Sequence, residues 1–515
     1  MALTKWTHKS PWILLKIFLL GALNSFTIWA VPILISHKSY VFAGYFVIST
    51  IIIDFVFLSK KIIAGKYIIP GVLLLVAFTI YPAMFTGYIA FTNYSTGHTL
   101  DKKTAIDVLV SNSYESVGES AIYPAKVAKD DISGEFVFFV QIDKSNVVLS
   151  RKNSEVPVPN SEITFASDGT IEKVQGFTLL DDNAVFENSD ELTSLYLSAG
   201  PGKVYQLADP TSVQELIQNL KYDPVKDEIT NIITGNVYKP NDKGSMVDSA
   251  GEELEPGWQS TVGLFNFERI FKDPRYRAPM VQVLTWTFIF AFLVVLTTFF
   301  AGFLLALTFN HPKLKSKRIY RSLIIVPYAM PGVLSMLTWR GMYNEENGII
   351  NRVLGHQFPW LSDPTLAKVA ILITQLWAGT PYMFLICTGA IQALSSEVIE
   401  AAQVDGASPR TVFWRIKLPL VLYSLTPLLI ASYAYNFSNF NAIYLLTGGG
   451  PQIIESGGIA GHTDILISYT YRLAFTAGKG NDYGLASAVS FLNFFIIATI
   501  SIYGFRKSKT VESMS

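Results

Sequence analysis

Cysteine is nearly absent from this sequence, and charged side chains are scarce. A single cysteine, Cys387, excludes a disulfide framework, a Cys-x-x-Cys redox pair and a cysteine zinc site. The six histidines are scattered without the spacing of paired ligands, so neither a metal ion nor another cofactor is expected. Charged residues make up 16% of the chain, against about a quarter in soluble domains, and the net charge of zero argues against a nucleic-acid partner.

Motifs of enzyme chemistry are missing as well. There is no Gly-x-x-x-x-Gly-Lys-Ser/Thr loop, so the chain is not expected to hold the phosphates of ATP itself. Gly-x-Ser-x-Gly, His-Glu-x-x-His and dinucleotide-binding patterns are also absent. No catalytic residue is expected, and the chain is predicted not to be an enzyme.

Long apolar runs dominate what is present, since 50% of the residues are hydrophobic and the mean hydropathy is +0.34. A helix that rises about 1.5 Å per residue needs about 20 apolar residues to cross a hydrocarbon core of about 30 Å. The sequence predicts eight such helices, at 12–35, 40–58, 67–91, 281–309, 319–343, 366–394, 418–440 and 483–505. The first run has the flanking lysines of a signal peptide, but its length and the second run directly after it favour a spanning helix.

Lysine and arginine are distributed unevenly between the two sets of short connecting loops. One set carries 17 of these residues and the other carries six. The larger set is Lys5, Lys9, Lys16, Lys60, Lys61, Lys66, Lys313, Lys315, Lys317, Arg318, Arg321, Arg410, Arg415, Lys417, Arg506, Lys507 and Lys509, and the smaller is Lys38, Arg340, Arg352, Lys368, Arg472 and Lys479. Because basic residues favour the cytoplasmic side, both termini are predicted to be cytoplasmic.

The chain is expected to divide into three parts. N-terminal transmembrane helices occupy 1–92, an extracytoplasmic soluble domain occupies 93–278, and a permease-like helical core occupies 279–515. The middle part holds 29 acidic and 17 basic residues. This charge either only keeps the surface solvated or also steers a partner.

The inserted domain is predicted to be β-rich with mixed α/β structure. Alternating apolar residues at 135–142 and 144–149 predict strands, and a turn is expected at 167–170. The stretch 209–220 predicts a short helix. The predicted class is therefore an all-α polytopic membrane protein that carries a β-rich insert.

The segment 395–419, between the sixth and seventh predicted spans, has the punctuation of two short helices. Ser395 can cap the first helix, and Gly406 can end it because glycine tolerates a positive φ. Ser408 can cap a second helix that has Pro409 at its first position. Small alanines would let another protein approach closely, although an ordinary amphipathic turn has a similar pattern.

The same segment resembles the EAA loop of ABC-importer permeases. The similarity lies in the Glu-Ala-Ala triplet at 400–402, the glycine four residues later and Ile-x-Leu-Pro at 416–419. The resemblance implies that 395–419 is a coupling loop that docks on an ATP-hydrolysing subunit. The coupling residues that it implies are Glu400, Ala401, Ala402, Asp405 and Gly406.

Further motifs extend the resemblance over nearly the whole chain. They are Asn93-Tyr94, Pro327-Tyr328-Ala-Met-Pro331, Trp377-Ala-Gly379-Thr-Pro381-Tyr382, Asn436-Phe437-Ser-Asn439-Phe440, Leu446-Thr447-Gly448-Gly449-Gly450-Pro451 and Thr463-Asp464-Ile-Leu. They are similar to the larger permease subunits of maltose/maltodextrin importers, in the binding-protein-dependent transport system inner-membrane component family. The resemblance implies the fold of a type I ABC-importer permease.

Breaks in the fifth and sixth predicted spans indicate a polar cavity within the membrane. Pro327 and Pro331 interrupt the fifth span, and Gly379 and Pro381 interrupt the sixth. Backbone groups freed in this way are tolerated only against protein or a water-filled cavity.

The seventh span adds Asn436 and Asn439, three residues apart on one expected helical face, beside Tyr435. Amides can bind sugar hydroxyls, and aromatic rings can pack on the faces of a pyranose, so these residues suit a sugar. Polar residues that join two helices within the membrane explain the same pattern equally well. The resemblance implies sugar contacts at Tyr328, Gln375, Ala378, Gly379, Tyr382, Tyr435, Asn436 and Asn439. The chain departs from the family pattern at Gly332, Gln375 and Ala378, which leaves the sugar length open.

The resemblance implies a multi-pass permease that moves maltose and maltodextrins across the bacterial cytoplasmic (inner) membrane. Besides the lipid bilayer and the sugar, it implies three kinds of protein partner, namely a second, smaller permease subunit, two ATPase subunits and an extracytoplasmic sugar-binding protein. A permease for another oligosaccharide or neutral sugar stays open. A phosphate substrate is disfavoured because spans five to seven have no Lys or Arg deep in the membrane. A membrane receptor is disfavoured because it would lack the EAA-like loop. A proton-coupled carrier would need buried titratable groups, and Asp54 is the only, poor candidate for one.

Overall fold

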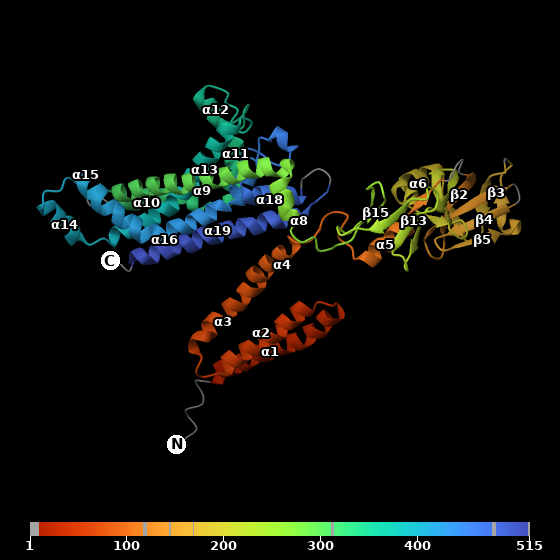
Figure 1. Ribbon diagram of the computed structural model, residues 1–515, viewed down its shortest axis with the longest axis horizontal. Coiled ribbons are helices and arrows are strands. Elements are labelled where there is room, and N and C mark those ends of the chain that lie inside the picture. The colour runs from red at the N-terminus through yellow and green to blue at the C-terminus, as the bar shows by residue number, and fades with distance from the viewer. Residues whose placement is uncertain are drawn as a thin grey trace, which may run out of the picture. The chain divides into compact units, whose positions relative to one another are not determined.

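The computed structural model describes residues 10–116, 121–143, 146–167, 169–310, 314–475 and 480–512, with side chains up to residue 507 (Figure 1). The chain forms two compact units, one up to residue 88 and one from residue 89 onward. Among the basic residues used to predict the orientation, Lys5, Lys9, Lys313, Lys479 and the side chain of Lys509 lie outside the described residues.

The first unit is built from apolar helices. Its elements are α1 (Ser10–Ser36), α2 (Tyr40–Leu58), α3 (Ile63–Leu75), a π-helical turn (Val76–Ile80) and the start of α4 (Tyr81–Ile89). Thr27 Oγ1 and Thr50 Oγ1 lie 2.7 Å apart between α1 and α2, and Asn24 Nδ2 donates to Asp54 Oδ2 at 2.9 Å. Such pairs join helices whose surroundings offer no water. The Asp54 carboxylate therefore has an amide of the neighbouring helix as a donor.

Seven helices among the described residues are long and apolar enough to cross a membrane, which confirms the predicted polytopic class. Those of the second unit are α9 (Pro274–Phe309), α13 (Pro364–Gln392), the run Pro409–Phe437 formed by α15 (Pro409–Val412), a π-helical turn (Phe413–Lys417) and α16 (Leu418–Phe437), and α19 (Tyr483–Glu512). The shorter helices are α5 (Lys102–Ser111), α6 (Asp182–Glu187), α7 (Ser189–Thr193), α8 (Phe265–Lys272), α12 (Ile349–Leu354), α14 (Ser396–Val404), α17 (Phe440–Tyr444) and α18 (Leu466–Phe475).

The predicted fifth span is a bent pair of helices instead of one straight helix. α10 (Lys317–Ala329) and α11 (Gly332–Met342) meet at 91°. Met330 between them is extended, with ψ of 139°, and Pro331 supplies no backbone N–H. The count of spans reaches eight when this pair is taken as one broken span.

Close packing of α9 against α13 holds the centre of the helical part. A Cβ at Gly302 of α9 would lie 2.6 Å from the backbone carbon of Met383, so only glycine allows this approach. Phe303 of α9, Phe384 of α13 and Val421 of α16 are buried in one apolar cluster beside it. The relative positions of these three helices are thereby fixed.

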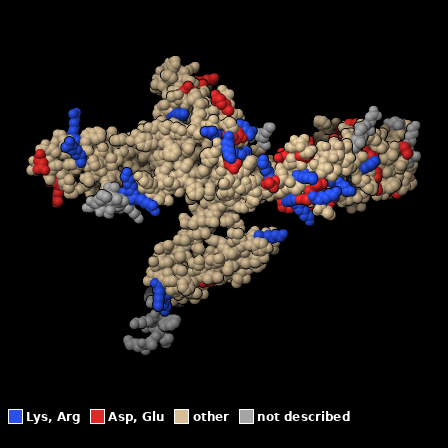
Figure 2. Space-filling view, viewed as in Figure 1, with Lys and Arg blue, Asp and Glu red and all other residues tan. Residues whose placement is uncertain are grey.

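The insert is β-rich, as predicted, and contains two sheets. Its strands are β1 (Tyr114–Glu115), β2 (Ile122–Asp130), β3 (Phe136–Asp143), β4 (Asn146–Arg151), β5 (Ser154–Val158), β6 (Ile163–Phe165), β7 (Ile171–Val174), β8 (Phe177–Leu179), β9 (Leu197–Ser198), β10 (Lys203–Asp209), β11 (Ser212–Gln218), β12 (Leu220–Asp223), β13 (Glu228–Asn231), β14 (Val237–Pro240), β15 (Met246–Val247) and β16 (Glu253–Leu254). The larger sheet follows the order β5-β4-β3-β2-β11-β10-β9, and the smaller sheet runs from β12 to β16 in sequence order. Figure 2 shows charged side chains gathered over this insert and near helix ends on the face in view.

Two predicted strands are confirmed and one predicted helix is wrong. Val140 of β3 pairs with Val148 of β4, while residues 144–145 and 168 of the predicted elements lie outside the described residues. The stretch 209–220 contains the last residue of β10, a turn, β11 and the start of β12 instead of a helix. The Asp209 carboxylate accepts from the backbone N–H of Thr211 at 2.8 Å, and β11 pairs with both β10 and β2. Pairing with distant strands therefore overrides the helical preference of this segment.

The two ends of the insert are tied together by Asn93. Its Oδ1 accepts from the backbone N–H of Ser260 at 2.7 Å, and its Nδ2 donates to the carbonyl oxygen of Trp258 at 2.9 Å. The backbone N–H of Asn93 also donates to the carbonyl oxygen of Ser260 at 3.1 Å. The chain therefore enters and leaves the insert at adjacent positions.

Candidate functional site

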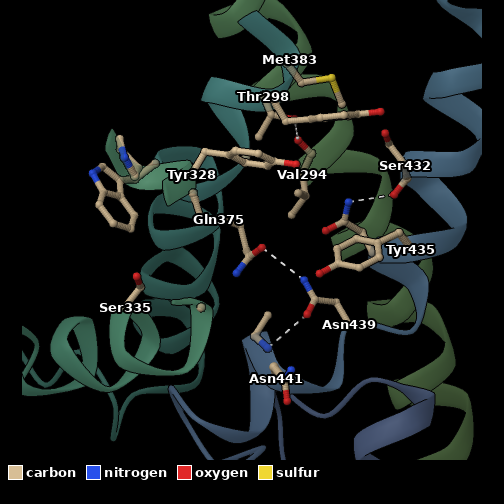
Figure 3. Close-up of a pocket in the computed structure, with 18 of the residues that line it drawn as sticks. Val294, Thr298, Tyr328, Ser335, Gln375, Met383, Ser432, Tyr435, Asn439 and Asn441 are labelled. Atoms are coloured by element: carbon tan, nitrogen blue, oxygen red, sulfur yellow. Dashed lines mark hydrogen bonds between the residues drawn. The ribbon is translucent and has the colours of Figure 1, made fainter. Parts of the chain in front are cut away.

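A cavity of about 590 Å³ lies within the helical part of the second unit (Figure 3). It is lined by Val294, Thr298, Pro327, Tyr328, Met330, Gly332, Ser335, Met336, Gln375, Trp377, Ala378, Gly379, Tyr382, Met383, Ala431, Ser432, Tyr435, Asn436, Asn439, Asn441 and Ala442. All eight residues expected to contact a sugar are in this set. The structure therefore brings them together, although their contact with a ligand stays a prediction.

The bend between α10 and α11 opens one wall of the cavity. Tyr328, near the end of α10, is 58% exposed, and Figure 3 shows its ring pointing toward Val294 of α9. Gly332 and Ser335 lie three residues apart at the start of α11, so one face of this helix reaches the cavity. The break predicted at Pro331 thus contributes directly to the lining, whereas Pro327 lies inside α10 and does not interrupt it as predicted.

Another wall comes from α13, which is continuous where the sequence predicted an interruption. The helix runs without a break through Gly379 and Pro381. Proline lacks the N–H that would bond the carbonyl oxygen of Trp377, so this acceptor is freed while the helix continues. A Cβ at Gly379 would lie 2.9 Å from Thr298 Cγ2, so this glycine serves close packing of α13 on α9.

Asn436 and Asn439 do not share a helical face, which corrects the prediction for the seventh span. α16 ends at Phe437, and Ser438 leaves the helical conformation with φ of −119°. Asn439 instead caps α17, where its side chain accepts from the backbone N–H of Ala442 at 3.3 Å. Both asparagines still line the cavity because the chain turns between them.

Internal hydrogen bonds already orient the cavity amides. Asn439 Nδ2 donates across the cavity to Gln375 Oε1 at 3.3 Å (Figure 3). Asn436 Nδ2 donates to the carbonyl oxygen of Ser432 in its own helix at 2.8 Å. Asn436 Oδ1 accepts no hydrogen bond from the described residues, so it remains available as an acceptor.

The lining carries no formal charge among its described residues, because it contains neither acidic nor basic side chains. It offers amides, hydroxyls and aromatic rings, including Tyr435, which is 69% exposed. Hydrogen bonds from amides and contacts with ring faces are suited to a neutral polyhydroxylated molecule. An ion would find no compensating charge here.

Several lining residues were not predicted from the sequence. Val294 and Thr298 lie in the middle of α9, where no local signal separates a cavity residue from a packing residue. Ser335 could have been found, because it lies one turn after Gly332 beyond the proline break. Asn441 lies in α17, beyond the predicted seventh span of 418–440.

The 395–419 segment contains the two predicted helix starts, but its second helix is not a separate short helix, because it continues through a π-helical turn into α16. Ser395 Oγ accepts from the backbone N–H of Glu397 at 3.2 Å at the start of α14. Gly406 has φ of +80° after this helix, and Ser408 Oγ accepts from the backbone N–H of Thr411 at 3.2 Å at the start of α15. This segment lies at the far end of the helices that line the cavity (Figure 1).

The predicted coupling residues lie together on the exposed part of this segment. Four of them, Glu400, Ala401, Asp405 and Gly406, are exposed, and Ala402 is partly buried. They are not in contact with the cavity. Their role in docking on another subunit stays a prediction.

Two family models match the chain. "Binding-protein-dependent transport system inner membrane component" matches residues 278–507, and "N-terminal of TM subunit in PBP-dependent ABC transporters" matches residues 73–151. A crystal structure of a bacterial ABC transporter involved in the import of alginate is also similar, with 21% identity and a TM-score of 0.41 over 48% of this chain and 84% of that chain.

Curated relatives align over almost the full length. The maltose/maltodextrin transport system permease protein MalF of Vibrio vulnificus (strain YJ016) is 36% identical over 97% of this chain and 96% of that protein. The protein of the same name from Salmonella typhi is 33% identical over 96% of each chain. The chain therefore belongs to the family of maltose/maltodextrin transport system permease proteins, which are inner membrane components of binding-protein-dependent transport systems.

Proposed function

We propose that this chain is the larger permease subunit of an ABC importer that carries maltose and maltodextrins across the bacterial inner membrane. The observation that carries the proposal is the uncharged cavity, in which amides from α13, α16 and α17 face tyrosine rings. Relatives at 36% and 33% identity that bear the name of maltose/maltodextrin permeases support the choice of sugar.

The proposed sugar contacts are those predicted from the sequence. Asn436 Oδ1 is placed to accept from a sugar hydroxyl, while Gln375 and Asn439 bond each other and exchange that bond for the ligand. The rings of Tyr328 and Tyr435 are exposed enough to pack on pyranose faces. Specificity for a neutral sugar then comes from hydrogen bonds that an uncharged cavity can supply.

This chain performs no bond chemistry in the proposal, and partner subunits supply the energy. Two ATPase subunits bind and hydrolyse ATP, and the coupling loop at 395–419 docks on one of them through Glu400–Gly406. A second, smaller permease completes the translocation path. Closure of the ATPase pair moves α14 and so changes the side to which the cavity opens.

The proposed topology follows the basic residues. Both termini and the coupling loop face the cytoplasm, and residues 93–278 form the extracytoplasmic domain between helices of 1–92 and 279–515. An external sugar-binding protein delivers the sugar to this side. The net acidic insert is the proposed surface for its approach.

Transport in a defined system tests the proposal. The chain is co-expressed with the smaller permease, the ATPase and the sugar-binding protein of the proposed complex, and the complex is reconstituted in liposomes. We expect ATP-dependent uptake of labelled maltose and maltotriose, and none of glycerol phosphate. Uptake of a different neutral sugar with no uptake of either maltodextrin would favour the alternative, a permease for another oligosaccharide.

A further inference from the structure

Three helix ends meet at one asparagine on the side of the helical part that carries the coupling loop. Asn310 directly follows α9, and its Nδ2 donates to the carbonyl oxygen of Ala306 at 2.8 Å. Its Oδ1 accepts from Arg321 Nη2 of α10 at 2.6 Å and from Gln392 Nε2 of α13 at 3.0 Å. Both polar atoms of this side chain are therefore used, and they join α9, α10 and α13.

The charge of Arg321 strengthens this junction. Its Nη2 also lies 3.4 Å from the carbonyl oxygen of Phe309, at the C-terminal end of α9. The last carbonyl groups of a helix carry partial negative charge, so a cation is favourable there. Hydrogen bonds from a guanidinium group are also stronger than those between neutral groups.

α10 depends on this contact more than its neighbours do. No residue of α10 is fully buried in this chain, whereas α9 and α13 each bury a series of residues. Apolar packing within the chain therefore holds α10 less firmly. A charge-assisted hydrogen bond near its start fixes the helix where packing does not.

The junction lies between the coupling loop and the cavity. Gln392 is the last residue of α13, and α14 begins four residues later at Ser396. In the other direction, Arg321 lies seven residues before Tyr328, which is about two turns along α10. A displacement of α14 thus reaches the end of α13 first and meets α10 through Asn310.

We propose that Arg321, Asn310 and Gln392 are positioning residues that transmit movement of the coupling loop to the α10 wall of the cavity. None of the three lines the cavity, so they act through other residues and do not contact the sugar. The inference rests on the proposed function and adds to it the contact that links ATP hydrolysis to cavity opening. A merely structural junction would affect assembly and not the ratio of transport to hydrolysis.

The ratio of sugar transported to ATP hydrolysed tests this role. It is measured on the assembled complex in liposomes, with the binding protein and maltose, for Arg321→Ala, Asn310→Ala and Gln392→Ala. We expect these complexes to hydrolyse ATP while the ratio falls about fivefold or more, which is the usual scale of coupling between sites. Gln392 is exposed, so its variant retains the fold even where Arg321→Ala assembles poorly.

Two matched variants control the experiment. Arg318→Ala removes the same charge from an exposed position one turn earlier in α10 and should keep the normal ratio. Asn310→Asp retains an acceptor for both Arg321 and Gln392 and should keep the ratio far closer to normal than Asn310→Ala does.

The inference is overturned if Gln392→Ala and one of the two other single variants, Arg321→Ala or Asn310→Ala, both keep a normal ratio of sugar transported to ATP hydrolysed. It is also overturned if this ratio falls equally in Arg318→Ala. If the unaltered complex couples hydrolysis to another sugar, the maltose assignment fails, and the same ratio for that sugar still decides the role of the junction.

Discussion

Replacement of Asn436 by alanine separates a ligand contact from a structural contact better than any other change in the cavity. The side chain is 8% exposed, and its Nδ2 donates only to the carbonyl oxygen of Ser432 in the same helix. That carbonyl oxygen already accepts the backbone N–H one helical turn later, so it keeps a partner in the variant. Asn439→Ala, in contrast, would lose both the cap of α17 and the bond to Gln375.

The expected effect of Asn436→Ala follows from the lost acceptor. A sugar hydroxyl left unpaired at this buried position costs about 1–3 kcal/mol, which corresponds to roughly a tenfold to hundredfold loss in affinity. We expect the uptake KM for maltose to rise by this factor, while the complex assembles and its ATPase activity responds to the binding protein. Uptake kinetics and ATPase activity are measured on the same purified preparation.

A matched control for this variant is Ser424→Ala. Ser424 lies on the same helix, its hydroxyl also donates to a carbonyl oxygen of that helix at 3.0 Å, and it does not line the cavity. It should transport normally. An unchanged KM in Asn436→Ala, or a loss of assembled complex that accounts for the lost uptake, would refute the reasoning.

Three further predictions concern other parts of the chain. Gly406→Pro should insert normally but uncouple transport from ATP hydrolysis, because proline cannot adopt the φ of +80° found there; equal uptake per ATP in the variant would contradict the role of the loop. A cysteine at Ser167 should react with an impermeant thiol reagent in intact cells, and one at Ser408 should not. The native Cys387 should add little background labelling because it is fully buried. The opposite labelling pattern would contradict the proposed topology. Backbone N–H groups hold the pKa of the Asp130 carboxyl below its usual value, so the ionised carboxyl stabilises the insert above about pH 4, and this contribution is lost as the pH falls further. Asp130→Asn should flatten this part of the acid-unfolding curve measured by circular dichroism. An unchanged curve would exclude the contribution.

Local chemistry made the coupling loop predictable in detail. Ser395, Gly406 and Ser408 each act within a few residues of their own position, through a cap or a positive φ. The bend at Pro331 is predictable for the same reason, because the N–H that proline lacks breaks a helix unless packing compensates for the lost hydrogen bond. Signals of this kind need no knowledge of the rest of the fold.

The errors arose where distant contacts decide the outcome. Pro381 leaves α13 continuous because the helix is held on α9 by close packing at Gly302 and Gly379, which the sequence does not reveal. β11 forms a strand because β2 and β10 lie on either side of it. The end of α16 at Phe437 was missed because Asn439 caps a short helix that has no periodic pattern of its own.

The tie that Asn93 makes to Ser260 has an evolutionary consequence. Because the two ends of the insert are hydrogen-bonded neighbours, a gene segment that encodes everything between them can be gained or removed without moving the helices on either side. Such an attachment allows a lineage of proteins to gain, lose or exchange this insert while the neighbouring helices are inherited unchanged.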